Sequence, residues 1–373
     1  SDQRRSEHLR HLISNIGGDI DIVIEDGSHR PRDQVSTCLT LMPLLQKNVI
    51  YVIEDVYDPS IVERLNKYYE VEVPPIDQPR ERYDNRLVVV RHKPPPINLS
   101  FFAKDPYRIG HDRHLGRVSS IIRGQQIAYH IGAKLNPTED YQNDVCIYVK
   151  PPWKPGDDFK FEGIRSCLDL VDETGYYELL KNHPEVTVIT LSDLNYKIVK
   201  RDLPNHKIVN IPQQHCNFER ARRRKRKITT VGIIGTIKAF DYLPKGIEEA
   251  LAKRSIKFIK FSQFTGRQDI IDFYLNIDVQ LVWRPYAKKL SNPLKIVNAM
   301  SFGVPTIAYD EPCFQEVKGG YIPVTTMEEF LKEFDKLTKT PKLYEKYNTI
   351  CLKKSEKYHI DKIGQLYKNL TKQ

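Results

Sequence analysis

The chain of 373 residues is long for one compact domain and sufficient for two or three, and 40% of its residues are hydrophobic, as in folded globular proteins. Its net charge of +10 suits an anionic ligand such as a nucleotide, but the basic run at 219–227 lacks the interleaved aromatic residues of a nucleic-acid site. No stretch approaches the roughly 20 apolar residues of a membrane span, and six scattered cysteines fit a reducing compartment, so we expect a cytoplasmic protein that binds no nucleic acid.

The first block, residues 1–92, begins with strand and helix signals in alternation. Short β-branched runs at 20–24 and 48–53 predict parallel strands covered on both faces, with a helix over 31–46 between them and a further strand over 85–92. Three consecutive prolines then mark a linker at 93–98.

Both of the first two strands end in acidic residues. Asp26 and His29 follow the first strand, and Glu54 and Asp55 follow the second. Because the carboxyl ends of neighbouring parallel strands meet at one edge of a sheet, we predict that Asp26, Glu54 and Asp55 supply oxygen ligands for Mg²⁺. His29 is then placed to act as a general base for a hydroxyl group that the metal has acidified. The alternative is that these groups only solvate the loops.

The motif DIVIEDGSH at 21–29, followed by LLQKNVIYVIEDV at 44–56, closely resembles the metal-dependent, S-adenosylmethionine-using O-methyltransferases that act on sugar hydroxyls. The resemblance implies that Asp26, Glu54 and Asp55 are the metal ligands and that His29 is the general base. It covers only the later half of such a domain, because the cofactor loop of that family lies upstream of the motif. It therefore implies either further domains N-terminal to this chain or a remnant that does not methylate.

The second block, residues 99–227, alternates strands and helices at the spacing of a doubly wound sheet. Strands are predicted over 97–103, 144–150, 185–192 and 206–212, and helices over 118–135 and 174–183. The segment from the first strand into the first helix is rich in arginine and histidine. His111, Arg113 and Arg123 are candidates for the acceptor side of a cleft, although such side chains are more often solvated or structural.

The third block, residues 228–345, opens with a strand that enters a turn at Gly235 and Thr236. Glycine here lets the backbone approach a bound group closely, although glycine after a strand is also common in plain turns. A later helix over 293–303 begins at a proline, with Ser291 or Asn292 suited to the cap and Lys295 in its first turn. Together with Arg284, this helix N-terminus predicts a cradle for pyrophosphate.

The stretch NPLKIVNAMSFGVPTIA at 292–308 resembles the donor-domain signature of retaining GT-B glycosyltransferases. The resemblance implies an α/β fold with two facing Rossmann-like domains, 99–227 for the acceptor and 228–345 for a nucleotide-sugar donor of unspecified base. It implies a terminal segment, 346–373, that packs back on the first of them. The donor-binding candidates are Gly235, Thr236, Lys238, Arg284, Asn292, Lys295 and Asn298.

The chain departs from that family where a pair of glutamates flanks the helix, since it carries Leu290 and Asn298 at those positions. The leading hypothesis is a glycosyltransferase that moves a hexosyl or deoxyhexosyl group from a nucleotide-sugar to a glycan or saccharide hydroxyl. The alternatives are a sugar O-methyltransferase, incomplete in this chain, and a non-catalytic scaffold whose sites have decayed.

Overall fold

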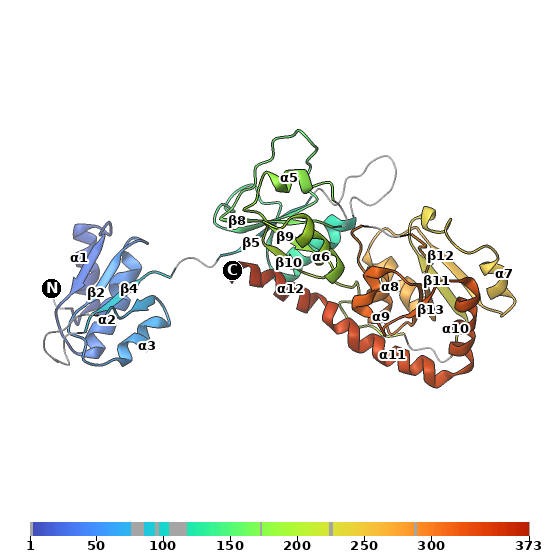
Figure 1. Cartoon of the computed structure of the whole chain (residues 1–373). Coiled ribbons are helices and arrows are strands. Elements are labelled where there is room, and N and C mark those ends of the chain that lie inside the picture. The colour runs from blue at the N-terminus through green and yellow to red at the C-terminus, as the bar shows by residue number, and fades with distance from the viewer. Residues whose placement is uncertain are drawn as a thin grey trace. The chain divides into compact units, whose positions relative to one another are not determined.

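The computed structural model divides into two compact units, Ser1–Pro96 and Ile97–Gln373, which are called unit 1 and unit 2 (Figure 1). The residues described are 3–75, 86–93, 97–103, 118–171, 174–223, 227–286 and 289–372. Within these ranges, no helix has both the length and the hydropathy needed to cross a bilayer.

Unit 1 contains one four-stranded sheet in the order β1-β2-β4-β3, with β1 and β2 parallel and β4 antiparallel to both β2 and β3. Its elements are α1 (Ser6–Ile16), β1 (Ile22–Glu25), α2 (Pro31–Leu41), a 3₁₀ turn (Met42–Leu44), β2 (Ile50–Ile53), α3 (Ser60–Asn66), β3 (Glu70–Glu72) and β4 (Val88–Arg91).

Side chains from all three helices pack on one face of this sheet. Tyr51 and Ile53 of β2 and Val88 and Val90 of β4 alternate onto that face and form a single core with α1, α2 and α3. Ile22 and Ile24 of β1 point to the other face and are 57% and 62% exposed. The prediction of a first strand covered on both faces is therefore wrong, because no helix among the described residues of unit 1 lies on that side.

Unit 2 contains two sheets in which every strand pair is parallel, of six strands (β10-β9-β8-β7-β5-β6) and five strands (β12-β11-β13-β14-β15). The strands are β5 (Leu99–Ala103), β6 (Lys134–Leu135), β7 (Val145–Val149), β8 (Arg165–Asp169), β9 (Thr187–Thr190), β10 (Ile208–Asn210), β11 (Thr230–Ile234), β12 (Lys257–Phe261), β13 (Val279–Val282), β14 (Thr306–Tyr309) and β15 (Ile322–Val324). The parallel order of both sheets, with helices between their strands, confirms the predicted α/β class with two Rossmann-like lobes.

Helices lie between many of these strands along the chain, but among the described residues β6, β7 and β8 follow one another without a helix, as do β10 and β11. The helices of unit 2 are a π-helix (Ser120–Gln125), α4 (Gln126–Ile131), α5 (Tyr177–Lys181), α6 (Asp193–Asp202), α7 (Ile247–Ala252), α8 (Arg267–Asn276), α9 (Leu294–Ser301), α10 (Met327–Lys339), α11 (Pro341–Ser355) and α12 (Ile360–Lys368), with 3₁₀ turns at Ile237–Ala239, Pro312–Val317, Glu356–Tyr358 and Asn369–Lys372. We call β5 to β10 with their helices and α12 the N-lobe, and β11 to α11 the C-lobe.

The C-terminal helix α12 returns from the C-lobe to the N-lobe, where Ile363 and Tyr367 join the core formed by Phe101 and Ile127 (Figure 1). Arg123, a candidate for the acceptor side, lies in this core instead of on the surface of the cleft. Its Nε donates to Asp169 Oδ2 at 2.8 Å, and the Tyr367 hydroxyl donates to the same oxygen at 2.9 Å. The contacts of Arg123 thus join the N-lobe sheet to the returning helix.

Candidate functional site

The N-terminus of α9 lies beside the ends of two C-lobe strands. Asn292 Oδ1 accepts a hydrogen bond from the Leu294 N–H at 3.0 Å, which caps the first turn of the helix. Lys295 follows in that turn, where the partial positive charge of the helix end favours anions. Arg284 comes two residues after β13, and Gly235 directly follows β11.

Gly235 lies close to the side chain of a lysine. A Cβ atom added at this position would lie 3.0 Å from Lys295 Nζ and 3.1 Å from Ala239 Cβ. Such distances are tighter than ordinary van der Waals contact, so a side chain here would make these neighbours shift slightly. The ammonium group of Lys295 therefore lies against the backbone turn after β11, where a bound anion could contact both.

A cavity of about 440 Å³ lies between the two lobes at this point. Its lining includes Gly235, Thr236, Arg284, Asn292 and Lys295 from the predicted donor site. The N-lobe contributes Val118 and Ile122. The structure therefore brings together donor-site candidates that lie up to sixty positions apart in the sequence, in a space of the size that small-molecule sites have, roughly 300–1,000 Å³.

The other two donor candidates lie elsewhere. Asn298 lines a smaller adjoining cavity of about 200 Å³, and its Oδ1 accepts the Cys216 N–H at 2.9 Å. Lys238 is exposed in the turn after β11 and lines neither cavity. His111 and Arg113, the remaining acceptor-side candidates, fall outside the described residues.

The charge of Arg284 is balanced by a carboxylate that the sequence analysis did not single out. Arg284 Nε lies 3.0 and 2.9 Å from the two oxygens of Glu311, a buried residue that follows β14. Burial lowers the pKa of the Arg284 guanidinium and Glu311 raises it, with a net upward shift. Glu311 comes two residues after the carboxyl end of the parallel strand β14, and this position is the sequence signal that could have found it.

Leu290 fills the position of the first glutamate of the family pattern, and its side chain is 2% exposed. It packs into an N-lobe cluster that includes Leu179 and Val199. Beside it, Ser192 Oγ donates to the Ser291 carbonyl at 3.1 Å, and the Ser291 N–H donates to Asn195 at 3.1 Å. The loop before α9 therefore links the two lobes at the place where the family carries a charged group.

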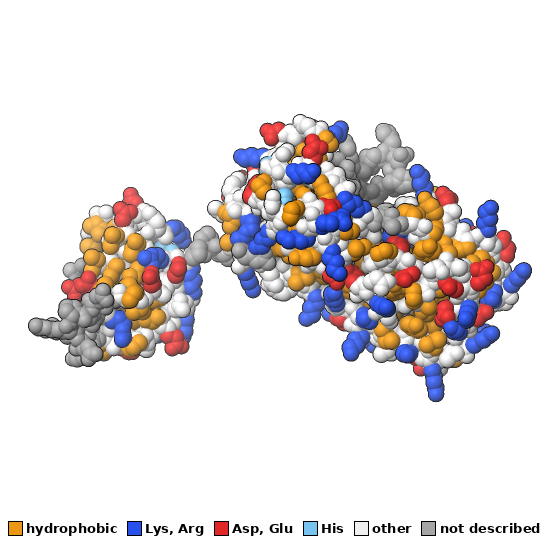
Figure 2. Space-filling view, in the orientation of Figure 1, with side chains coloured by type: hydrophobic (Ala, Val, Ile, Leu, Met, Phe, Trp, Pro, Cys, Tyr) orange, Lys and Arg blue, Asp and Glu red, His pale blue; other side chains and the backbone are white. Residues whose placement is uncertain are grey.

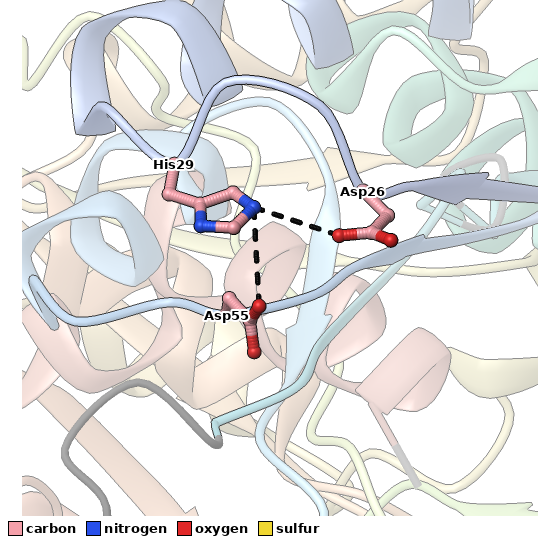
Figure 3. Close-up of side chains that lie close together, drawn as sticks. All are labelled: Asp26, His29 and Asp55. Carbon is pink, nitrogen blue, oxygen red and sulfur yellow. Dashed lines mark ion pairs between the residues drawn. The ribbon is translucent and has the colours of Figure 1, made fainter.

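In unit 1, the residues after β1 and β2 form a separate polar cluster (Figure 3). His29 Nε2 lies 3.5 Å from Asp26 Oδ1 and 3.8 Å from Asp55 Oδ2, and one ligand atom from each residue falls within 4.8 Å of the others. Asp55 has a φ of 49°, a left-handed conformation that is uncommon for residues other than glycine. Backbone strain of this kind often accompanies a functional site.

Glu54 is not part of the cluster of candidate ligand atoms among the described residues. Its backbone pairs instead, since the carbonyl accepts from Gln34 Nε2 at 3.0 Å and the N–H donates to Glu25 at 3.0 Å. The donor set that the geometry offers is thus two carboxylates and one imidazole. Such a mixed oxygen and nitrogen set suits a divalent transition metal as well as Mg²⁺.

Comparison with known proteins gives one relative by sequence. No protein-family model matches the chain. A protein of Haemophilus influenzae described as an uncharacterised glycosyltransferase is 23% identical over 243 residues, which are 57% of this chain and 67% of that protein.

Many solved structures align with the chain, and two of them illustrate the low identity of the match. The Glycosylation Associate Protein (Gap123) complex from Streptococcus agalactiae matches with a TM-score of 0.44 and 12% identity, over 72% of this chain and 61% of that one. Accessory secretory protein 1,2 and 3 of Streptococcus pneumoniae matches with a TM-score of 0.41 and 10% identity, over 63% and 54%. The match therefore spans less than two thirds of either solved chain.

Proposed function

We propose that unit 2 is a glycosyltransferase that moves a sugar from a nucleotide-sugar donor to a hydroxyl of a glycan or saccharide. The observation that carries the proposal is the meeting of Gly235, Arg284, Asn292 and Lys295 around one cavity between two α/β lobes. The similarity to an uncharacterised glycosyltransferase supports it.

In this proposal the residues of the C-lobe bind the diphosphate of the donor. Lys295 and the N-terminus of α9 supply positive charge, and the backbone at Gly235 lets the phosphates approach closely. Arg284 adds a planar guanidinium whose orientation Glu311 fixes. The same groups stabilise the charge that develops on the leaving diphosphate, which is the main demand of glycosyl transfer from such donors.

The test is to titrate the chain with UDP, GDP, ADP and inorganic pyrophosphate while its thermal unfolding is followed. A ligand at roughly 100 times its Kd stabilises the folded state by about 2.7 kcal/mol. We expect Lys295→Ala to weaken binding by about tenfold or more. Lys346→Ala is the matched control, because Lys346 is exposed on α11 and lines neither cavity, and it should bind as the wild type does. If none of these anions shifts the transition, the proposal is wrong.

A scaffold function is the second candidate for unit 2, and the burial of Leu290 favours it. A hydrophobic residue packed into the N-lobe cannot hold a sugar hydroxyl as a carboxylate does. Release of nucleoside diphosphate from nucleotide-sugars, with and without saccharide acceptors, separates the two candidates. Turnover supports the transferase, whereas tight nucleotide binding without turnover supports the scaffold.

For unit 1 we propose the metal- and base-carrying half of a sugar O-methyltransferase, on the basis of the Asp26, His29 and Asp55 cluster. In this proposal Asp26 and Asp55 would bind a divalent cation, and His29 would accept the proton of a sugar hydroxyl. S-Adenosylmethionine would supply the methyl group in such a reaction.

The test for unit 1 is calorimetric titration with Mg²⁺ and Mn²⁺. We expect Asp26→Asn to weaken cation binding by about tenfold or more, since it removes a charged ligand atom from the cluster. Asp19→Asn, a change of the same kind at another exposed site of unit 1, is the control and should leave binding unchanged. Equal affinities of Asp26→Asn and the wild type would contradict a metal site here.

A further inference from the structure

The smaller cavity between the lobes differs in character from the larger one beside it. Its volume is about 200 Å³, and Ile234, Phe264, Ile270 and Leu294 make much of its wall apolar. None of the described residues that line it is acidic. We call this cavity the slot.

One polar side chain of the slot has an unsatisfied atom. Gln214 is 1% exposed, and its Nε2 donates to the Ile122 carbonyl at 2.5 Å and to Gln126 Oε1 at 3.3 Å. The Ile122 carbonyl fixes which end of the Gln214 amide is nitrogen, because a backbone carbonyl can only accept and a reversed amide would set oxygen against oxygen. Gln214 Oε1 is buried and has no hydrogen-bond donor among the described residues.

A buried carbonyl without a donor costs about 1–3 kcal/mol, and most such atoms in folded proteins are paired. If the slot bound no ligand, no interaction would offset this free-energy cost. The last torsion of the glutamine side chain is broad, so a small rotation can turn Oε1 toward a group in the slot. A ligand that brings an N–H or O–H donor would satisfy the atom.

The slot and the larger cavity share part of their lining. Gly235, Phe264, Leu294 and Lys295 border both of them. A ligand whose phosphates lie against Lys295 therefore has its neighbouring part at the mouth of the slot. Much of the wall of the slot is apolar, so an uncharged group suits it, and a flat ring can pack against the aromatic side chain of Phe264. Two basic side chains, Arg267 and Lys295, also line the slot.

We infer that the slot receives the nucleoside end of the donor and that Gln214 Oε1 accepts a hydrogen bond from an N–H of its base or an O–H of its ribose. The inference rests on the proposed nucleotide-sugar site and adds to it a residue that selects the ligand. Gln214 then distinguishes a nucleoside diphosphate from a bare pyrophosphate, because only the former reaches the slot. A hydrogen bond to an otherwise unpaired buried group is also the kind of contact that discriminates strongly between ligands.

The experiment compares the binding of UDP, GDP and ADP with that of inorganic pyrophosphate by calorimetry. For the nucleotide that binds best, we expect Gln214→Met to lower the affinity about tenfold and to leave pyrophosphate binding unchanged. Gln365→Met, at an exposed position of α12, is the matched control and should alter neither. Retained pyrophosphate binding also establishes that the Gln214→Met variant is folded at the anion site.

A second measurement uses the wild-type chain alone. The best-binding nucleotide is compared with its analogues in which the base N–H is methylated or a ribose hydroxyl is replaced by hydrogen. Loss of affinity with one of them supports the inference and identifies the donor atom. If nucleotide and pyrophosphate bind equally well and Gln214→Met changes neither, the inference is wrong while the anion site stands. If neither class binds, both the inference and the proposed function fail.

Discussion

The sheets of unit 1 and unit 2 are built from similar apolar, β-branched runs but are covered to different extents. In β7, β9, β11 and β13 of unit 2, every residue is buried. In β1 of unit 1, Ile22 and Ile24 are more than half exposed, and Figure 2 shows hydrophobic side chains gathered on the surface of unit 1. The strand sequence alone therefore does not determine whether a parallel strand is buried on both faces.

The difference arises from the helices. In unit 2, each of the helices α4 to α9 connects two parallel strands, an arrangement that places helices on the faces of a sheet. In unit 1, α1, α2 and α3 contribute to a single core on one side of the sheet. The polar cluster of Asp26, His29 and Asp55 thus stands on a half-covered sheet, whereas the cavities of unit 2 lie between two covered ones.

The largest expected effect is the loss of a buried charge pair in unit 2. Arg123 and Asp169 are both fully buried, so Arg123→Ala leaves a buried carboxylate without its cation and should reduce the free energy of unfolding by about 3–5 kcal/mol. The matched change in unit 1 is Arg91→Ala, which breaks an exposed pair with Glu72 and should cost no more than about 1 kcal/mol.

The two units can be followed separately in that experiment. Both tryptophans of the chain, Trp153 and Trp283, lie in unit 2, so tryptophan fluorescence during urea unfolding reports on unit 2 and far-ultraviolet circular dichroism reports on both. A loss below about 1 kcal/mol for Arg123→Ala would contradict the assignment of Arg123 to a structural pair and restore it as a candidate for the cleft.

A smaller effect is expected from truncating one isoleucine in each unit. Ile147 of β7 is fully buried, and Ile147→Ala should destabilise unit 2 by about 2–5 kcal/mol, because it removes buried methyl groups and leaves a cavity. Ile24→Ala should change the stability of unit 1 by no more than about 0.5 kcal/mol, as at other surface positions. A large loss for Ile24→Ala would mean that the open face of β1 is covered in solution.

Much of the fold could be predicted from the sequence, because β-branched runs and helix caps are local signals. The elements that were not predicted, such as α6 and β8, have weaker local signals. Helix α6 is rich in charged residues, and only its cap, in which Ser192 Oγ accepts the Asn195 N–H at 3.1 Å, marks where it begins. Strand β8, Arg165–Asp169, has polar residues at both ends. Whether a helix covers the outer face of β1 depends on other segments of the chain, so the exposure of this face cannot be predicted from the strand sequence alone.

The candidate site likewise contains residues that local signals predict and residues that depend on distant contacts. Gly235 and Lys295 could be predicted because each adjoins an element with a clear start or end. Glu311 and Gln214 could not, because their roles depend on contacts with Arg284, Ile122 and other residues distant in sequence. For Arg123, a position near a polar loop suggested the cleft, whereas its partner, Asp169, lies 46 residues away.

The last prediction concerns a buried histidine in unit 2. His215 is buried beside His359, and its Nδ1 accepts the Asn217 N–H at 3.2 Å, which requires a neutral ring. Burial, followed by His359 and Arg220, lowers the pKa of His215 from 6.5 to about 3. The folded state therefore binds fewer protons here than the unfolded state between these pH values. The stability that follows is present above pH 6.5 and is lost as the pH falls toward 3.

Urea unfolding of unit 2, followed by tryptophan fluorescence, should give a free energy of unfolding that falls by up to about 1.4 kcal/mol per pH unit below pH 6.5 from this one group. His215→Gln should reduce that slope. His29→Gln in unit 1, where the side chain is 46% exposed, is the control and should leave the fluorescence transition unchanged at every pH. An unchanged slope in His215→Gln would contradict a neutral, buried His215 and would weaken the contrast between the enclosed interior of unit 2 and the open surface of unit 1.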